Sequence, residues 1–187
     1  MRYRGDLTAL ILADAARLSA LRAVRSLGLT DCWIAAGFVR DAVWDHLHGY
    51  APRPPYGDVD TVWFNPDRRD AAWDVAIGTG LSRRLPQFDW SVKNQARMHT
   101  RNGDRPYRSV ADAMTFWPET ATAVAIRLTD DGLLEVNAPL GLEDLFSLKL
   151  APTSAFSGAK YAQFEARIAA KGWLRRYPML RRSILQS

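Results

Sequence analysis

Cysteine and histidine are scarce in this chain of 187 residues, which has one cysteine, Cys32, and three histidines. A lone cysteine excludes an intramolecular disulfide and a metal site built from cysteines. It also suits a reducing compartment, so we expect the protein in the cytoplasm. Because Cys32 stands next to a tryptophan, we interpret it as a small buried hydrophobic residue and not as a nucleophile.

Long apolar runs are absent as well. No stretch of about 18 uncharged apolar residues occurs, so we expect no membrane-spanning segment and no membrane partner. Asp6 and Asp14 interrupt the first apolar residues, so we expect no signal peptide. A hydrophobic content of 48% with 24% charged residues is ordinary for a folded protein. We expect one domain over residues 1–187, with a core at about 31–150 and a basic, helical C-terminal extension at about 151–187.

The net charge of +5 is unevenly distributed. From residue 160 onward the chain carries seven basic residues and one acid, so the excess positive charge lies entirely there. Such a segment can bind a polyphosphate or a nucleic-acid backbone. The alternative is a solvated helical face with no ligand.

Residues 33–64 organise the chain. An apolar run meets Gly37, a helix-like segment and a proline-rich loop follow, and a second apolar run begins with Asp58 and Asp60. Residues i and i+2 of a strand share a face, so the two carboxylates should lie side by side with Val59 turned into the core. Adjacent carboxylates repel each other unless a cation neutralises them, and Mg²⁺ binds through one or two carboxylates together with substrate phosphates. A glycine followed by a helix N-terminus suits an anion.

Hydrophobic periodicity, together with the glycine, proline and capping residues that end helices and strands, predicts alternating strands and helices. We expect the helix before this stretch to be continuous, with Asp6 as its N-cap and Gly28 as its C-cap. The helix after Asp67 should turn Ala72, Val75 and Ala76 inward and end at Gly78 and Gly80. The expected helices cover residues 6–27, 37–48, 67–80, 109–116 and 160–174, and the expected strands cover residues 33–36, 58–64, 88–93, 120–128 and 133–137.

The run AAGFVRDAVWDHLHG followed by GDVD resembles the nucleotidyltransferase superfamily built on the DNA polymerase beta palm. Val39-Arg40-Asp41 is similar to the signature of tRNA nucleotidyltransferases and poly(A) polymerases. Three further stretches, 89–99, 117–128 and 138–150, resemble a small bacterial nucleotidyltransferase-like family. The resemblance implies an α+β fold with a mixed β-sheet of polymerase-beta palm type, flanking helices and a helical C-terminal extension. Ala36 departs from the pattern because the signature has a glycine there.

The candidate site combines these two lines of reasoning. Asp58 and Asp60 would hold Mg²⁺, with Mn²⁺ as an alternative, and Gly37 with Phe38 would present the helix start to a nucleotide. Arg40 would bind phosphate, or would instead pair with a neighbouring carboxylate.

The next strand offers further candidates. The site type implied by the resemblance usually takes a third carboxylate from that strand, and Asp89 is available there, unless Ser91 occupies the equivalent place. Asn94 and Arg97 follow in a dense polar cluster and are expected to bind the nucleotide.

We therefore expect a metal-dependent nucleotidyltransferase that moves a nucleoside monophosphate from an NTP to an acceptor hydroxyl and releases pyrophosphate. The acceptor stays open among RNA, protein and small molecules. The main alternative is a non-catalytic relative that binds nucleotide or RNA. Two others are a metal-dependent phosphodiesterase, for which three histidines are few, and a toxin-system component that acts with a partner protein.

Overall fold

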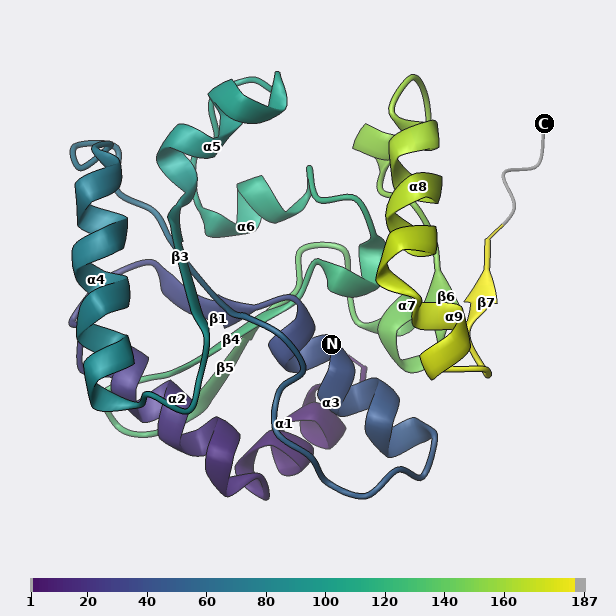
Figure 1. Ribbon diagram of the computed structural model, residues 1–187, viewed down its shortest axis with the longest axis horizontal. Coiled ribbons are helices and arrows are strands. Elements are labelled where there is room, and N and C mark those ends of the chain that lie inside the picture. The colour runs from purple at the N-terminus through teal and green to yellow at the C-terminus, as the bar shows by residue number, and fades with distance from the viewer. Residues whose placement is uncertain (1, 184–187) are drawn as a thin grey trace.

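The computed structural model describes residues 2–183, and its centre is a mixed sheet of five strands (Figure 1). The strands lie in the order β3-β2-β1-β4-β5, and within this sheet only β2 and β3 run parallel. Their bounds are β1 Cys32–Ala35, β2 Val59–Trp63, β3 Trp90–Asn94, β4 Ala125–Leu128 and β5 Leu134–Asn137. The sheet and its flanking helices confirm the expected α+β class.

Helices flank the sheet, and two of them, α8 and α9, follow it in the C-terminal part of the chain. They are α1 Arg4–Leu12, α2 Ala15–Arg25, α3 Gly37–Leu47, α4 Ala71–Arg84, α5 Gln95–Asn102, α6 Val110–Met114, α7 Glu143–Phe146, α8 Tyr161–Lys171 and α9 Trp173–Arg176, with short 3-10 turns at Thr120–Thr122 and Ser154–Phe156. Among the residues that the structure describes, no helix is both long and apolar enough to cross a bilayer.

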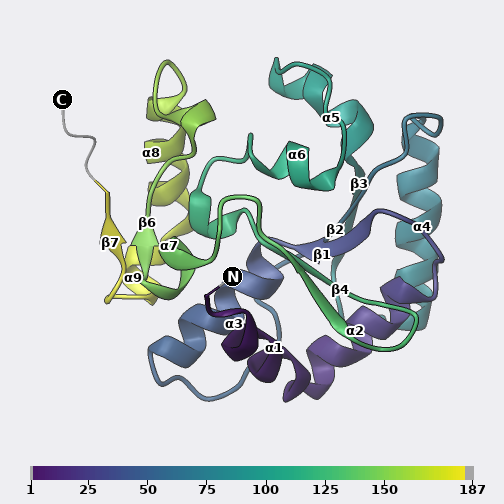
Figure 2. The ribbon, with the colours of Figure 1, turned by 180° about the vertical axis from the view of Figure 1, so that it is seen from behind.

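The two faces of the sheet pack against different layers. Val59 of β2 belongs to the larger core, which α1 to α4 cover, whereas Val62 packs with Met114 of α6 on the other face. Figure 2 shows α5 and α6 on one side of the sheet and α1 to α3 on the other. Because successive strand residues face opposite sides, Asp58 and Asp60 share the face of Val62 and point toward the α6 side.

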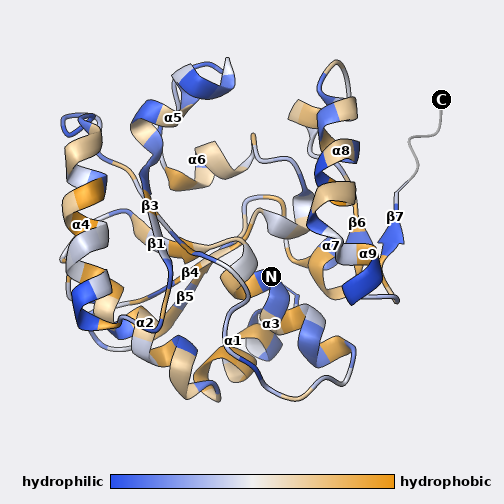
Figure 3. Cartoon of the chain, in the orientation of Figure 1, coloured by the Kyte–Doolittle hydropathy of each residue, from blue (hydrophilic) through white to orange (hydrophobic). Residues whose placement is uncertain are grey.

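The C-terminal segment packs onto the same core. Phe164, Trp173 and Tyr177 are fully buried in the cluster that also contains the sheet residues. Between α9 and residue 183 the chain forms no helix, and β7 (Arg181–Arg182) pairs in parallel with β6 (Lys149–Leu150). Figure 3 shows β7 and much of β3 as hydrophilic, whereas hydrophobic residues prevail in β1 and β4.

The expected helix over 6–27 is wrong in one respect, since the structure has two helices with a break at Ala13 and Asp14. The Asp14 side chain accepts a hydrogen bond from the Arg17 backbone N–H at 2.9 Å. Aspartate competes for backbone donors in this way and starts a new helix where periodicity alone predicts continuity. Asp14, and not Asp6, is therefore the capping residue.

The expectations for α4 were also wrong. The helix continues through Gly78 and Gly80 to Arg84, and Val75 is 67% exposed instead of inward. The inward face carries the buried Asp74, which accepts a hydrogen bond from Trp63 Nε1 at 2.7 Å. This hydrogen bond decides which face of α4 is turned toward the sheet, and hydrophobic periodicity does not reveal it.

The expected strand over 120–128 begins only at Ala125, because Thr120–Thr122 form a 3-10 turn. The Thr120 hydroxyl donates to Asp144 Oδ2 at 2.6 Å, and the Thr122 hydroxyl accepts from Arg40. These side chains take part in long-range contacts that a β-propensity argument cannot see. The hairpin that leads to β5 and the Ser109 cap of α6 are confirmed.

Candidate active site

The start of β2 carries the two carboxylates on which the site depends. Asp58 and Asp60 line one cavity of about 260 Å³, which we call the carboxylate cavity, and Val59 between them is fully buried on the other side of the strand. This is the arrangement that strand alternation predicts. The start of α3 and residues of α8 and α9 complete the walls of the cavity.

The electrostatics of Asp60 follow from this placement. The pKa of Asp60 is raised from its ordinary 3.8 to about 6, first because the side chain is largely withdrawn from water and second because of the negative charge of Asp58. Ser91 on β3 and the positive charges of Arg167 and Arg40 act in the opposite direction. A buried carboxylate beside a second one favours either a proton or a cation, because both remove the repulsion.

The turn before α3 has an unusual backbone. Ala36 has φ +55° and ψ −123°, a conformation that glycine adopts far more easily than alanine. Its N–H donates to the Val124 carbonyl at 2.9 Å, which fixes the turn against the chain that leads into β4. No side chain caps the N-terminus of α3 at Gly37, and both Ala36 and Gly37 line the carboxylate cavity. The N–H groups of Val39 and Arg40 donate to the Ala36 carbonyl, so those of Gly37 and Phe38 are the ones available to an anion.

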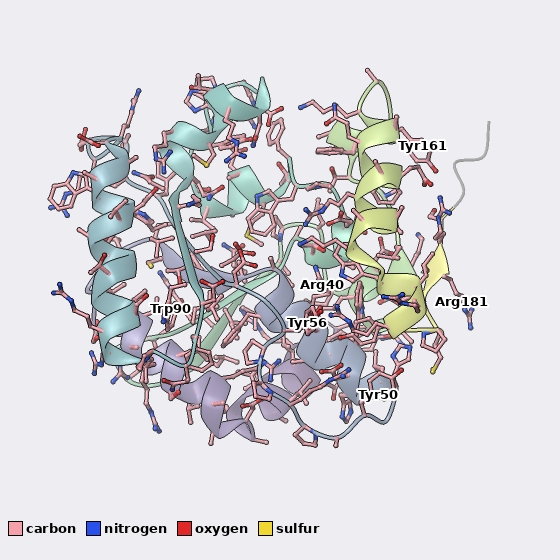
Figure 4. The ribbon with its side chains drawn as sticks, viewed as in Figure 1. Arg40, Tyr50, Tyr56, Trp90, Tyr161 and Arg181 are labelled. Atoms are coloured by element: carbon pink, nitrogen blue, oxygen red, sulfur yellow. The ribbon has the colours of Figure 1, made fainter. Side chains whose placement is uncertain are left out.

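Arg40 lines the same cavity but already has partners. Its guanidinium donates to Asp41 Oδ1 at 2.9 and 2.7 Å and to the Thr122 hydroxyl at 3.1 Å. The guanidinium also lies against the rings of Trp44 and Trp173, at 5.0 and 4.3 Å from their centroids. The expected alternative, an ion pair with a neighbouring carboxylate, is therefore present, and Arg40 is held rigidly at the cavity wall (Figure 4).

The C-terminal segment supplies three further cations, Arg167, Lys171 and Arg176. Arg167 is held by an ion pair with the fully buried Glu119 at 2.7 Å. The Arg176 guanidinium lies 3.5 Å from the centroid of the Tyr56 ring. The sequence predicted a basic C-terminal segment but did not assign any of these three side chains to the site. The excess positive charge of that segment was the signal that could have identified them.

The structure does not bring Asp89 into the cavity. Asp89 is exposed and precedes β3, where its carbonyl accepts from the Val59 N–H, while Ser91 is the register partner of Asp60. Among residues 2–183, no three acidic, histidine or cysteine side chains lie close enough together to hold a metal ion. The centre in this structure therefore has two carboxylates, with a serine in the neighbouring strand position.

Asn94 and Arg97 also lie outside the carboxylate cavity. The Asn94 amide accepts from the N–H groups of Asn65 and Ala96 and donates to two carbonyls of the loop before α4, so its hydrogen-bonding capacity is used. Arg97 pairs with the buried Asp74. Both side chains therefore organise the junction of β3, α4 and α5, and their expected contact with the nucleotide stays a prediction that this placement does not support.

Phe38 is fully buried in the core, so its side chain does not reach the carboxylate cavity. Its carbonyl accepts from Arg17 Nε at 3.0 Å. Phe38 can therefore contribute to binding at this helix start through its backbone N–H but not through its side chain.

Comparison with solved structures supports the fold. The protein described by "The NMR structure of the protein reveals a CCA-adding enzyme head domain" is similar with a TM-score of 0.85 and 30% identity, over 96% of this chain and 95% of that chain. The Thermotoga maritima CCA-adding enzyme complexed with tRNA matches with a TM-score of 0.59 and 16% identity, over 96% of this chain and 42% of that one. A CCA-adding enzyme with CTP matches with a TM-score of 0.59 and 15% identity, over 95% of this chain and 43% of that one.

The last two likenesses show the fold alone, and this chain spans less than half the length of those enzymes. No curated protein matches this chain significantly. The family model described as "Nucleotidyltransferase" matches residues 22–182, which include the whole sheet and all the residues of the carboxylate cavity. The chain therefore belongs to this nucleotidyltransferase family.

Proposed function

We propose that the protein transfers a nucleoside monophosphate from an NTP to an acceptor hydroxyl, with divalent metal ions held by Asp58 and Asp60. One observation carries the proposal: two adjacent carboxylates and an uncapped helix N-terminus line the same cavity of about 260 Å³, together with Arg40, Arg167 and Arg176. Membership of the family supports nucleotidyl transfer in general. Enzymes of the same fold have been solved with CTP and with ATP, which supports an NTP as donor.

The residues present fit a hard divalent cation. Asp58 and Asp60 offer carboxylate oxygens, the donor type that Mg²⁺ and Mn²⁺ prefer. Burial and the negative charge of Asp58 raise the pKa of Asp60 even though Arg167 and Arg40 lie nearby, and a bound cation would relieve both effects. When bound, the metal would polarise the phosphoryl oxygens and neutralise charge that develops on them.

The protein's own groups bind and orient the donor. The backbone N–H groups of Gly37 and Phe38 at the start of α3 donate hydrogen bonds to phosphate oxygens, and Lys171 and Arg176 neutralise the leaving pyrophosphate. The acceptor hydroxyl oxygen forms a bond to the α-phosphorus while the bond from phosphorus to the bridging oxygen breaks. The electron pair leaves with pyrophosphate, and the hydroxyl proton passes to solvent. Positioning and electrostatics supply most of the rate enhancement in reactions of this kind.

A second candidate function is nucleotide or RNA binding without turnover. The observation that favours it is the two-carboxylate centre, because the expected third carboxylate, Asp89, does not line the carboxylate cavity. Release of pyrophosphate separates the two functions, since a binding protein forms none.

The test is incubation with each α-phosphate-labelled NTP, Mg²⁺ or Mn²⁺ and a cell extract that supplies acceptors. We expect a labelled acceptor and pyrophosphate with the wild type, and at least a hundredfold less of both with Asp58→Asn or Asp60→Asn. Asp67→Asn, which removes a charge at an exposed position outside the carboxylate cavity, is the matched control. Nucleotide binding with no pyrophosphate from any of the NTPs would establish the second candidate instead.

A further inference from the structure

A second cavity of about 230 Å³ adjoins the carboxylate cavity, and we call it the Trp117 cavity. The two cavities share Ala36, Asp60 and Arg167 as lining residues. Asp60 therefore stands at the boundary, with the uncapped start of α3 on one side and the Trp117 cavity on the other. Neither the family match nor the likeness to solved structures assigns a ligand to this second cavity.

The Trp117 cavity has a different chemistry from the carboxylate cavity. Trp117 and Met98 provide an indole face and a thioether, both of which pack well on a planar ring. The amides of Gln95 and Asn102 also line it and can bond to the edge of such a ring. Lys93, together with the shared Arg167, places positive charge beside these groups and can bind an anion.

The geometry of phosphoryl transfer relates one cavity to the leaving group and the other to the entering group. The entering and leaving oxygens lie on opposite sides of the phosphorus in an in-line displacement. In the proposed function, pyrophosphate leaves into the carboxylate cavity, where the α3 N-terminus and the residues Lys171 and Arg176 lie. The entering hydroxyl must then approach from the other side of Asp60, which is the side of the Trp117 cavity.

We infer that the Trp117 cavity is the acceptor subsite, and that the acceptor presents one planar ring and one anionic group next to its hydroxyl. This inference rests on the proposed function. The volume, about 230 Å³, is below the range of roughly 300–1,000 Å³ that is usual for pockets holding larger ligands, so the cavity takes a single ring-bearing unit. Such a unit is a mononucleotide, either free or at the end of a chain.

The test measures binding to protein labelled with ¹⁵N in its tryptophan indoles, saturated with Mg²⁺ and either α,β-methylene-ATP or α,β-methylene-CTP. AMP and a short oligoribonucleotide with a free 3′-hydroxyl are the probes, in separate arms. We expect at least one probe to shift the indole signal of Trp117, with the dissociation constant raised about tenfold by Trp117→Leu. Trp73→Ala, a change of an exposed tryptophan on α4, should leave that constant unchanged.

Trp117 packs against the smaller core cluster, so the leucine variant keeps an apolar side chain there, and its urea midpoint verifies that it folds. The probe whose binding depends on Trp117 shows whether the acceptor is a free mononucleotide or the end of a chain. The inference is overturned if a probe displaces the donor analogue, if Trp117→Leu binds as well as the wild type, or if neither probe binds. If neither of these analogues binds, those of GTP and UTP are used, and failure of all four to bind would instead overturn the proposed function.

Discussion

Replacing Asp60 with asparagine should stabilise the metal-free protein while abolishing transfer. Asparagine has nearly the same shape but carries no charge, so it removes the repulsion from Asp58 and the cost of burying a carboxylate. The rise of the pKa of Asp60 from 3.8 to about 6 corresponds to at most about 3 kcal/mol at 1.36 kcal/mol per pH unit. Because the side chain retains some exposure to solvent, we expect a gain of about 1–2 kcal/mol at pH 7.5.

The sign of the pH dependence follows from proton linkage. Between pH 3.8 and about 6 the folded wild type binds more protons at Asp60 than the unfolded chain does, so this residue makes stability fall as the pH rises through that window. Above pH 6 the destabilisation is complete. The advantage of the asparagine variant should therefore be full at pH 7.5 and about a third as large at pH 4.5.

The assay is urea denaturation of both proteins in EDTA at pH 7.5 and 4.5, repeated at pH 7.5 with excess Mg²⁺. Magnesium should stabilise the wild type, since it binds the folded carboxylate pair, and should have less effect on the variant. Asp67→Asn controls for the loss of one surface charge. A variant less stable than the wild type in EDTA at pH 7.5, or an advantage that does not change with pH, would refute the reasoning.

Three further predictions concern stability. Ala36→Gly should raise the unfolding free energy by about 1 kcal/mol because relief of a positive φ outweighs the added chain entropy, whereas Ala35→Gly in the neighbouring extended strand should lower it by about that amount; urea midpoints of the two variants decide this. Arg167→Met should lower the unfolding free energy by about 3 kcal/mol because it leaves the Glu119 charge buried without a partner. Glu119→Gln should lower it by only about 1 kcal/mol, because the partly exposed Arg167 side chain can reach water. Equal losses in urea titrations would contradict this asymmetry. Asn94→Ala should lower the unfolding free energy by about 2–3 kcal/mol while the KM for NTP stays unchanged, and a raised KM in a variant that still folds would restore Asn94 to the site.

Local patterns carried much of the prediction. Alternation in β2 is a property of the backbone, so the shared side of Asp58 and Asp60 followed from their spacing alone. The Ser109 cap and the turn before β5 depend on residues close in the chain, and both are confirmed. The resemblance to nucleotidyltransferases rested on short motifs, and the family match and the fold bear it out.

The misplaced residues depend on contacts between distant parts of the chain. Asn94 and Arg97 are polar residues next to a strand end, a position that is equally suited to binding a ligand and to organising a loop. Asp74 is buried on the inward face of α4 because it accepts a hydrogen bond from Trp63 and pairs with Arg97. Hydrophobic periodicity measures only the residues of one helix, so it contains no information about such partners.

The sequence by itself determined the pair of carboxylates, the glycine turn and the helix that follows, because each is set by dihedral preferences and side-chain alternation over a few residues. Only the tertiary structure decided which cations meet that pair. Arg167 reaches the side of Asp60 because Phe164 and Trp173 bury α8 and α9 against the core and Glu119 holds the guanidinium. Burial of apolar surface has no direction, so the position of a docked helix emerges from the packing of the whole chain and not from the helix's own residues.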